Sequence, residues 1–297
     1  MVTKPNFLLE YAIDSLLKTF NQERKPVMKK AHFFKLMNLL DTRLKNQEVD
    51  IGLPGYWYKY GFYIEINHLN SVLPREFSKF YVINDTFIVP PLNPRKKYEI
   101  LDEIKNKIDS TIRSLWQQFG LKPGYGAAVK KKSYEINAPY KFNSIFQEYI
   151  DIVNRTETGF ISKKETLEPV LDKLLPEFPD KAFFELYDTY LEWDDTTRLC
   201  LDLLSGKKEE ELIKELEELF WETFSKGVRI RHNQNIPDPE IIKRWKIEYE
   251  YEIPRTHKHI ENIRNSLLLD KYKSSGKDEI LVKQLMKKAY QMSAEAN

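Results

Sequence analysis

The spacing of the apolar residues changes twice in the first 120 residues, and this change constrains the fold more than any other feature. Between residues 6 and 45 apolar residues recur every three or four positions, as on one face of a helix. From Tyr56 to Ile66 they recur at every second position, as on one face of a β-strand. From residue 97 to residue 119 the helical spacing returns. We therefore expect an α+β domain at this end of the chain.

The N-terminal residues predict two helices. The first runs from Asn6, a candidate N-cap, to Phe20. The second begins after Pro26 and ends near Lys45. Its apolar face consists of Phe33, Leu36, Met37, Leu40 and Leu44. Its polar side consists of Lys29, Lys30, Lys35 and Arg43.

The next segment, LPGYWYKYGFYIEI (53–66), is the most aromatic run of the chain. Its alternation predicts one half-buried strand, bent at Gly61. The residues expected on its core side are Tyr56, Tyr58, Tyr60, Phe62, Ile64 and Ile66. Trp57, Lys59 and Tyr63 alternate with them, so we expect these three to face a partner or nucleic acid.

The elements that follow complete the predicted domain. A short helical segment spans residues 68–80 and is broken at Pro74. Residues 81–83 and 87–89 then form a hairpin across a two-residue turn at Asn84 and Asp85, which tolerate positive φ. A long helix runs from residue 97 to residue 119, and Gly120 ends it.

The rest of the chain divides into a linker and a helical part. Residues 121–144 contain glycine, proline and a lysine triplet, which is typical of an irregular basic connection. From residue 145 to residue 297 the pattern is helical, and the run 209–230 places leucine and phenylalanine on one face and glutamate on the other. We expect a domain over residues 1–120 and a helical bundle over residues 145–297.

Two short motifs resemble a known family. FFKLMNLLD (33–41) followed by YWYKYGFY (56–63) is similar to Panacea-type antitoxin domains and related winged-helix components of bacterial and archaeal defence or toxin–antitoxin modules. The resemblance covers about residues 28–90. It implies a winged-helix-like, non-enzymatic domain that binds DNA or a partner protein. Together with the helical pattern of the later residues, the order of elements predicts an α+β, mostly α chain with a winged-helix-like N-terminal domain.

The winged-helix interpretation assigns the recognition helix to residues 66–80. The candidate contacts there are His68, Asn70, Ser71, Arg75 and Lys79. Basic residues nearby would add phosphate contacts, and they are Lys29, Lys30, Lys96, Lys97, Lys130, Lys131 and Lys132. An ordinary solvated surface remains the alternative for these lysines, because 47 basic residues nearly balance 45 acidic ones and the net charge is only +2.

Two clusters leave an enzyme open as an alternative. Asp188, Glu192 and Asp195 lie at helical spacing and would hold a divalent cation or form a solvated face, with Arg198 placed to pair with Asp194. Arg231 and His232 lie in a polar, turn-rich segment. The single cysteine, Cys200, lies in an apolar run and is expected to be inert. We expect no catalytic residue, no metal and no cofactor.

The absence of a leader, of a disulfide partner for the cysteine and of a long apolar run predicts a cytoplasmic protein without a membrane partner. The leading hypothesis is a non-catalytic DNA-binding or protein-binding component of a regulatory, anti-phage defence or toxin–antitoxin module. Its partner would be duplex DNA, another protein or a second copy of the chain. The alternatives are a metal-dependent or nucleic-acid-processing enzyme that uses the helical domain, and a scaffold subunit of a larger complex.

Overall fold

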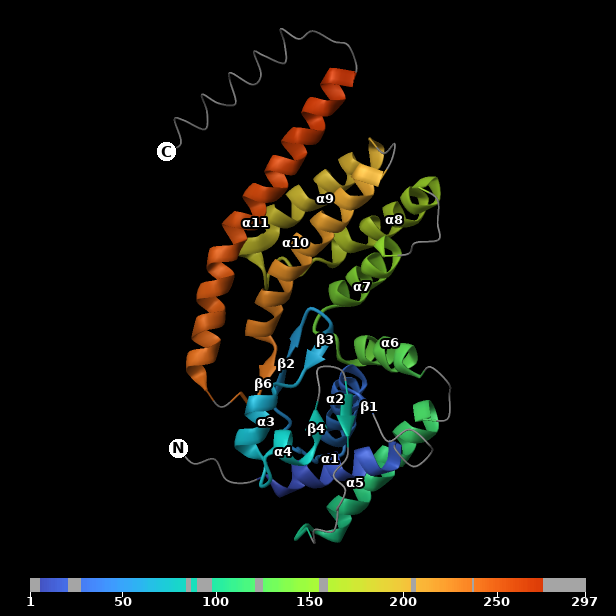
Figure 1. Ribbon diagram of the computed structural model, residues 1–297, viewed down its shortest axis with the longest axis vertical. Coiled ribbons are helices and arrows are strands. Elements are labelled where there is room, and N and C mark those ends of the chain that lie inside the picture. The colour runs from blue at the N-terminus through green and yellow to red at the C-terminus, as the bar shows by residue number, and fades with distance from the viewer. Residues whose placement is uncertain are drawn as a thin grey trace. The chain divides into compact units, whose positions relative to one another are not determined.

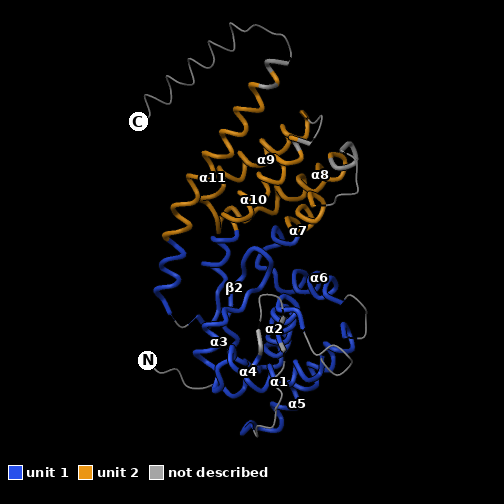
Figure 2. The backbone as a smooth tube through the Cα atoms, viewed as in Figure 1, with its two compact units in different colours: residues 1–144, 225–246 blue, residues 145–224, 247–297 orange. Residues whose placement is uncertain are grey.

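The computed structural model describes residues 6–20, 28–83, 87–89, 98–120, 125–154, 160–203, 207–236 and 238–274. The chain divides into two compact units (Figure 2). The first unit contains residues 1–144 and 225–246, and the second contains residues 145–224 and 247–297. Helices dominate, and the described strands all belong to the first unit (Figure 1). The predicted α+β, mostly α class is confirmed.

The first unit begins with the two predicted helices, α1 (Phe7–Phe20) and α2 (Lys30–Lys45). Asn6 caps α1, because its Oδ1 accepts a hydrogen bond of 2.9 Å from the backbone N–H of Leu9. All the residues predicted for the apolar face of α2 are fully buried. The apolar spacing alone was sufficient to place these two helices in the core.

A small antiparallel sheet joins segments on both sides of α2. It contains β1 (Met28–Lys29), β4 (Val82–Ile83) and β5 (Phe87–Val89) in the order β1-β5-β4. The predicted hairpin between β4 and β5 is therefore confirmed. Its register pairs Ile83 with Ile88 and leaves residues 84–87 between them, so the connection is longer than the predicted two-residue turn. Asn84 and Asp85 themselves lie outside the described residues.

The predicted single strand over residues 56–66 is wrong. The chain forms a hairpin of β2 (Gly55–Tyr58) and β3 (Gly61–Tyr63), and β6 (Asn233–Gln234) pairs with the outer side of β2. Tyr58 pairs with Gly61 across the turn. Gly61 has a φ of +98°, a conformation that glycine adopts more readily than other residues. The glycine therefore marks a reversal of the chain and not a bend.

The predicted break at Pro74 is observed, since α3 (Ile66–Val72) and α4 (Phe77–Phe80) lie on either side of it. Helix α5 (Asp102–Leu115) begins later than predicted and continues as a π-helix, η1 (Trp116–Gly120), that ends at the predicted glycine. Helix α5 packs against both α1 and α2.

The segment predicted to be an irregular linker contains helix α6 (Gly126–Asn137), which packs against α2. This expectation was wrong because proline and glycine lie only at the two ends of the segment, whereas residues 127–137 contain neither. The lysine triplet accordingly lies on a helix of the first unit.

The second unit is built from helices. They are α7 (Lys141–Val153), α8 (Phe160–Leu174), the short 3₁₀ helices η2 (Leu175–Glu177) and η3 (Phe184–Leu186), α9 (Tyr187–Asp202), α10 (Lys207–Arg231) and α11 (Pro239–Ser274). The division between the units falls within α7, α10 and α11, so each of these helices contributes to both.

Stacked aromatic rings form the core of the second unit. Phe146 and Trp221 stack with ring centroids 4.6 Å apart, and Phe178 and Tyr190 stack at 4.3 Å. Phe220 is fully buried among them, as the amphipathic pattern of residues 209–230 predicts. Across the described ranges, no helix combines the length and apolar character needed to cross a bilayer.

Candidate binding surface of the first unit

One face of the β2–β3 hairpin and the start of α2 enclose a groove of about 540 Å³. We call it the tyrosine–lysine groove. It is lined by Lys29, Lys30, Ala31, Phe34, Lys35, Tyr56, Tyr58, Tyr60, Gly61, Phe62 and Tyr63. Because Tyr56 pairs with Tyr63 across the hairpin, their side chains extend from the same face of the sheet.

The rings of the groove are held in place by one another. Tyr56 lies with its ring centroid 5.4 Å from that of Tyr63 and 4.8 Å from that of Trp245. The guanidinium of Arg229 lies 5.0 Å from the ring centroid of Tyr58 and 4.5 Å from that of Trp245, at cation–π distance. Burial raises the pKa of the Tyr56 phenol, so this group stays neutral at physiological pH. The groove is therefore formed before any ligand arrives.

Lysines give the groove a positive potential. The ammonium of Lys35 is almost buried and donates a 3.0 Å hydrogen bond to the backbone oxygen of Tyr60, which fixes the hairpin turn to α2. Burial, with a smaller contribution from the charge of Lys130, lowers the pKa of Lys35 to about 8. Lys29 is exposed, and the ammonium of Lys30 lies 5.8 Å from the ring centroid of Phe34.

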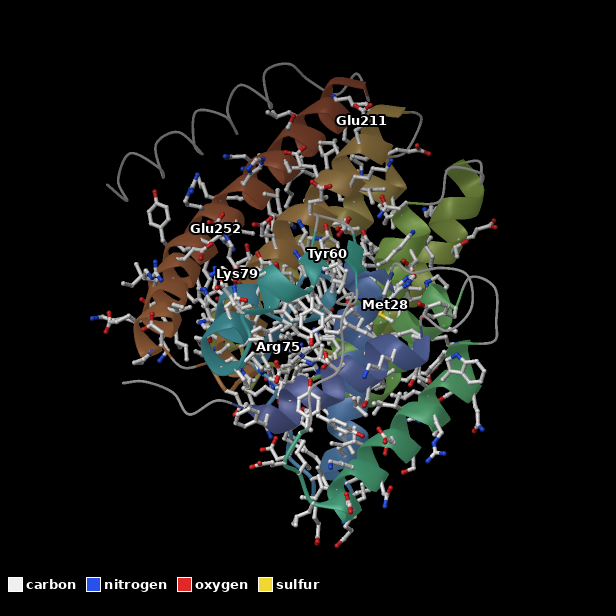
Figure 3. The ribbon with its side chains drawn as sticks, turned by 60° about the horizontal axis from the view of Figure 1, so that its bottom comes forward. Met28, Tyr60, Arg75, Lys79, Glu211 and Glu252 are labelled. Carbon is white, nitrogen blue, oxygen red and sulfur yellow. The ribbon has the colours of Figure 1, made fainter. Side chains whose placement is uncertain are left out.

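Tyr60 is the most accessible ring of the groove. It lies at the turn between β2 and β3 (Figure 3) and is 72% exposed. The prediction that placed Tyr60 in the core is wrong, because the reversal of the chain at this turn carries its side chain outward. A solvent-exposed tyrosine beside a rigid aromatic cluster is a common feature of binding surfaces.

Of the three hairpin residues predicted to face a partner, two lie near this surface. Tyr63 lines the groove and Lys59 is half-buried in the turn. Trp57 is only 6% exposed, and its ring lies 5.4 Å from that of Tyr134. The expectation for Trp57 is wrong because helix α6, which was predicted to be a loop, covers its side of the hairpin.

The predicted recognition segment is largely engaged in internal contacts. His68 is buried, and burial lowers its pKa. The side chain of Asn70 bonds both the backbone N–H and the hydroxyl of Ser78, at 3.0 and 3.1 Å. Ser71 donates a 2.8 Å hydrogen bond to the backbone oxygen of His68. Lys79 is exposed and pairs with Glu76 at 2.5 Å. His68 is therefore not a surface contact, and this prediction is wrong.

Arg75, one of the predicted DNA contacts, has a different role. Its guanidinium donates to the buried carboxylates of Glu10 and Asp14, with the Asp14 contact at 2.8 Å. The hydroxyls of Tyr81 and Tyr98 also donate to Asp14. Arg75 therefore ties α1 to the segment between α3 and α4, and it is not available to a phosphate or a base.

The remaining basic candidates differ in exposure, in ion pairing and in distance from the groove. Lys130 is half-buried and Lys131 is exposed, both on α6. Lys132 forms an ion pair of 3.0 Å with Glu135. Lys96 and Lys97 lie outside the described residues. Lys29, Lys30 and Lys130 are therefore the predicted phosphate contacts that lie at or beside the groove.

The acidic residues of α9 do not converge on a metal site. Glu192 accepts a 2.8 Å hydrogen bond from Arg264, and Asp195 lies 4.0 Å from the same guanidinium. The predicted pair of Arg198 with Asp194 is confirmed at 2.8 Å. Within the described ranges, no group of three or more histidine, cysteine, aspartate or glutamate side chains is arranged to hold a metal ion.

Asn233 and Gln234, which lie in the segment predicted to be polar and turn-rich, form strand β6 at the edge of a sheet, whereas Arg231 is the last residue of α10. The backbone N–H of Trp57 donates to the oxygen of His232 at 3.0 Å, and Asn233 pairs with Tyr56. The imidazole Nε2 of His232 lies 2.8 Å from the hydroxyl of Tyr140. Burial, with a smaller effect of Arg231, lowers the pKa of His232, so this imidazole is neutral at physiological pH.

Comparison with protein-family models, with curated proteins and with solved structures finds no match to this chain. The functional interpretation therefore depends on the chemistry of the site. Sequence reasoning missed Lys35 and Tyr60 as members of the groove. The signal for Tyr60 was the glycine that follows it, since the pattern Lys-Tyr-Gly after a strand is compatible with a tight turn.

Proposed function

We propose that this protein is a non-catalytic binding component of a regulatory or defence module, and that its first unit binds duplex DNA. The observation that carries the proposal is the tyrosine–lysine groove, where lysine ammonium groups lie beside a preformed set of rings. Lysines bind phosphate as point charges, and aromatic side chains provide apolar contacts to sugars and bases.

The topology of the first sheet supports a winged-helix-like domain. In that architecture a short strand between the first two helices pairs with the second strand of a C-terminal hairpin. Here β1 lies between α1 and α2 and pairs with β5, and β5 pairs with β4. The hairpin β2–β3 is then an addition between α2 and α3. This support is an analogy of fold and by itself does not assign a function.

The charge distribution also favours a local contact with a polyanion. The net charge of the chain is only +2, so attraction to DNA has to come from one patch. Lys29, Lys30 and Lys35 provide such a patch at the groove, and Lys130 is close enough to lower the pKa of Lys35. A phosphate at this patch would stabilise the charged form of Lys35.

We propose that the first unit contacts the DNA backbone and makes few contacts with base edges. The side chains predicted to read base edges, Asn70 and Arg75, are engaged inside the unit. Phosphate contacts position a protein on the duplex but do not by themselves select a sequence. Binding should therefore depend strongly on salt and weakly on sequence.

A protein partner is the second candidate, and the exposure of Tyr60 favours it. A ring that is 72% exposed beside packed tyrosines resembles an interface anchor, and tyrosine is enriched at such positions. The lysines around it would suit an acidic partner surface. The partner would be a toxin, nuclease or ATPase encoded next to this chain.

Two measurements separate these candidates. Fluorescence anisotropy with several duplexes of unrelated sequence, at salt from about 50 to 200 mM, should show similar affinities that fall steeply with salt. The absence of duplex binding at the lowest salt, with an intact circular dichroism spectrum, would exclude the DNA proposal. Co-expression with the neighbouring genes would then show a stoichiometric complex that Tyr60→Ala weakens.

A further inference from the structure

The rings that line the tyrosine–lysine groove differ in their exposure. Phe34 and Tyr56 are buried. Tyr58 and Tyr63 extend from the same face of the hairpin as Tyr56 and are half-buried. Tyr60 is exposed at the turn of the hairpin (Figure 3). The groove therefore presents one accessible ring beside a packed aromatic cluster.

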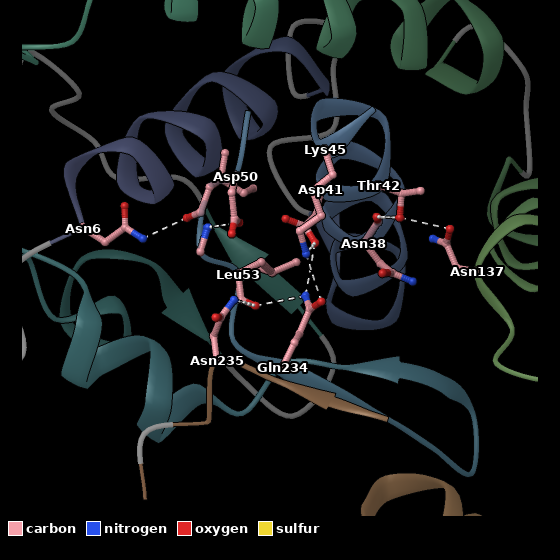
Figure 4. Close-up of polar contacts among 12 residues, drawn as sticks. Asn6, Asn38, Asp41, Thr42, Lys45, Asp50, Leu53, Asn137, Gln234 and Asn235 are labelled. Atoms are coloured by element: carbon pink, nitrogen blue, oxygen red, sulfur yellow. Dashed lines mark hydrogen bonds and ion pairs between the residues drawn. The ribbon is translucent and has the colours of Figure 1, made fainter. Parts of the chain in front are cut away.

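The hairpin that carries these rings is fixed on both of its sides. Towards α2, the ammonium of Lys35 donates to the backbone oxygen of Tyr60. Along the outer edge of β2, strand β6 is paired, and the side-chain amide of Gln234 donates to the backbone oxygen of Leu53 at 3.0 Å and to Oδ2 of Asp41 at 3.1 Å (Figure 4). A ligand therefore does not have to order the hairpin before it binds, and this lowers the cost of binding.

Positive charge lies beside the same rings. Lys29 is exposed and lines the groove, and the ammonium of Lys30 lies 5.8 Å from the ring centroid of Phe34. Phe34 in turn packs against Tyr63, with their ring centroids 5.2 Å apart. A nucleotide has a flat face on its base and negative charge on its phosphate. The groove therefore offers a complementary group to each of these two parts.

Intact duplex DNA would use only the lysines of such a groove. Its phosphates lie on the outside, whereas the faces of its bases are covered by the neighbouring base pairs. The ring of Tyr60 would then have no base on which to stack. An unpaired base has an uncovered face, and its stacking on an aromatic side chain depends little on which base it is.

We propose that the tyrosine–lysine groove binds an unpaired nucleotide of a DNA fork or single-stranded end, with the base stacked on Tyr60 and the phosphates at Lys29 and Lys30. Such a site rests on the proposed DNA binding and narrows its ligand to DNA in which paired and unpaired strands meet. The groove volume of about 540 Å³ lies within the range of small-molecule sites, so a single nucleotide has room there. Because every base can stack, binding remains largely independent of sequence.

Three DNAs that share one duplex test the proposal by fluorescence anisotropy with the full chain. The first is blunt, the second ends in a fork of two unpaired tails, and the third has the same fork with abasic sites in its tails. The two forks carry the same phosphates and differ only in their bases. At about 50 mM salt the wild type should bind the fork with bases at least about fivefold more tightly than the abasic fork.

Variants of Tyr60 test which ring the base stacks on. Tyr60→Ala should bring the ratio of the two fork affinities close to one, whereas Tyr60→Phe keeps the ring and should keep the ratio. Tyr251→Ala is the matched control, because Tyr251 is 65% exposed, against 72% for Tyr60, and lies on α11 outside the groove. It should also keep the ratio. A merely structural role of Tyr60 would lower both fork affinities together.

The three DNAs separate failure of this site from failure of the proposed function. Equal binding of the two forks, together with binding of the blunt duplex, would overturn the unpaired-nucleotide site and leave the proposed contact to the DNA backbone intact. A wild-type ratio in Tyr60→Ala would overturn the stacking on Tyr60. The absence of binding to all three DNAs would overturn both the site and the proposed DNA binding.

Discussion

Replacement of Arg75 by methionine is the perturbation that the structure allows us to predict most closely. The guanidinium bridges Glu10 and Asp14, whose side chains are 0% and 1% exposed, while Arg75 itself is 15% exposed. Methionine preserves most of the aliphatic packing of arginine but removes the charge. Two buried carboxylates then lose the cation that compensates them, and such a loss is strongly destabilising.

The magnitude follows from this geometry. Breaking a buried ion pair by removal of one partner costs about 3–5 kcal/mol. For a protein of this size each kcal/mol lowers the melting temperature by roughly 2–4 °C, so the expected fall is roughly 6–20 °C. Lys79→Met is the matched control, because Lys79 belongs to an exposed pair with Glu76 whose side chains are 73% and 40% exposed. Its effect should stay below about 1 kcal/mol.

Differential scanning calorimetry of the full chain measures both variants. A triple variant that also carries Glu10→Gln and Asp14→Asn should regain much of the lost stability, because it removes the uncompensated charges together with their partner. If Arg75→Met melts within a degree or two of the wild type and instead loses DNA binding, the assignment of Arg75 to the interior is refuted.

Three further outcomes follow from the structure. Gly61→Ala should destabilise the protein by about 1–3 kcal/mol in urea denaturation, because Gly61 has a φ of +98° and an added Cβ would lie 3.3 Å from Tyr134; an unchanged midpoint would contradict this. Lys35 has a pKa of about 8 in the folded protein and of 10.5 as a free side chain. Between pH 8 and pH 10.5, Lys35 is therefore more often protonated in the unfolded chain than in the folded protein. Stability should therefore rise with pH across that window, by on the order of 3 kcal/mol in total, and Lys35→Met should flatten the rise in a series of urea titrations. Trp221→Ala should cost about 3–5 kcal/mol in the same assay, because this fully buried ring stacks on Phe146; a loss below about 1 kcal/mol would show that the stack is dispensable.

Elements determined by local sequence were predictable. The apolar spacing of α1 and α2 and the cap at Asn6 depend on residues within one or two helical turns, and the structure confirms them. The hairpin at Gly61 was missed because aromatic residues occupy nearly every position from 56 to 63. Such a run is compatible with a continuous strand and also with two strands, so its alternation does not reveal the turn.

Features that depend on distant residues were not predictable. Arg75 was assigned to a DNA contact because its partners Glu10 and Asp14 lie on α1, 65 and 61 positions earlier in the chain. Likewise, Asp41 meets Gln234 across 193 positions. No local sequence pattern indicates a contact between residues so far apart in the chain. The polar stripe on α2 did leave a signal, since Asn38, Asp41, Thr42 and Lys45 keep helical spacing.

We propose that the lysines at the tyrosine–lysine groove bind the DNA backbone, and a comparison of two charge-matched variants tests this contact. One variant carries Lys29→Glu and Lys30→Glu at the groove, and the other carries Lys18→Glu and Arg113→Glu, which are exposed in the same unit and do not line the groove. Anisotropy titrations with duplex DNA at about 50 and 200 mM salt should show a loss of tenfold or more and a shallower salt dependence for the groove variant. The second variant should lose much less. Equal losses in the two variants would show that only the overall charge matters and would contradict the assignment of the groove.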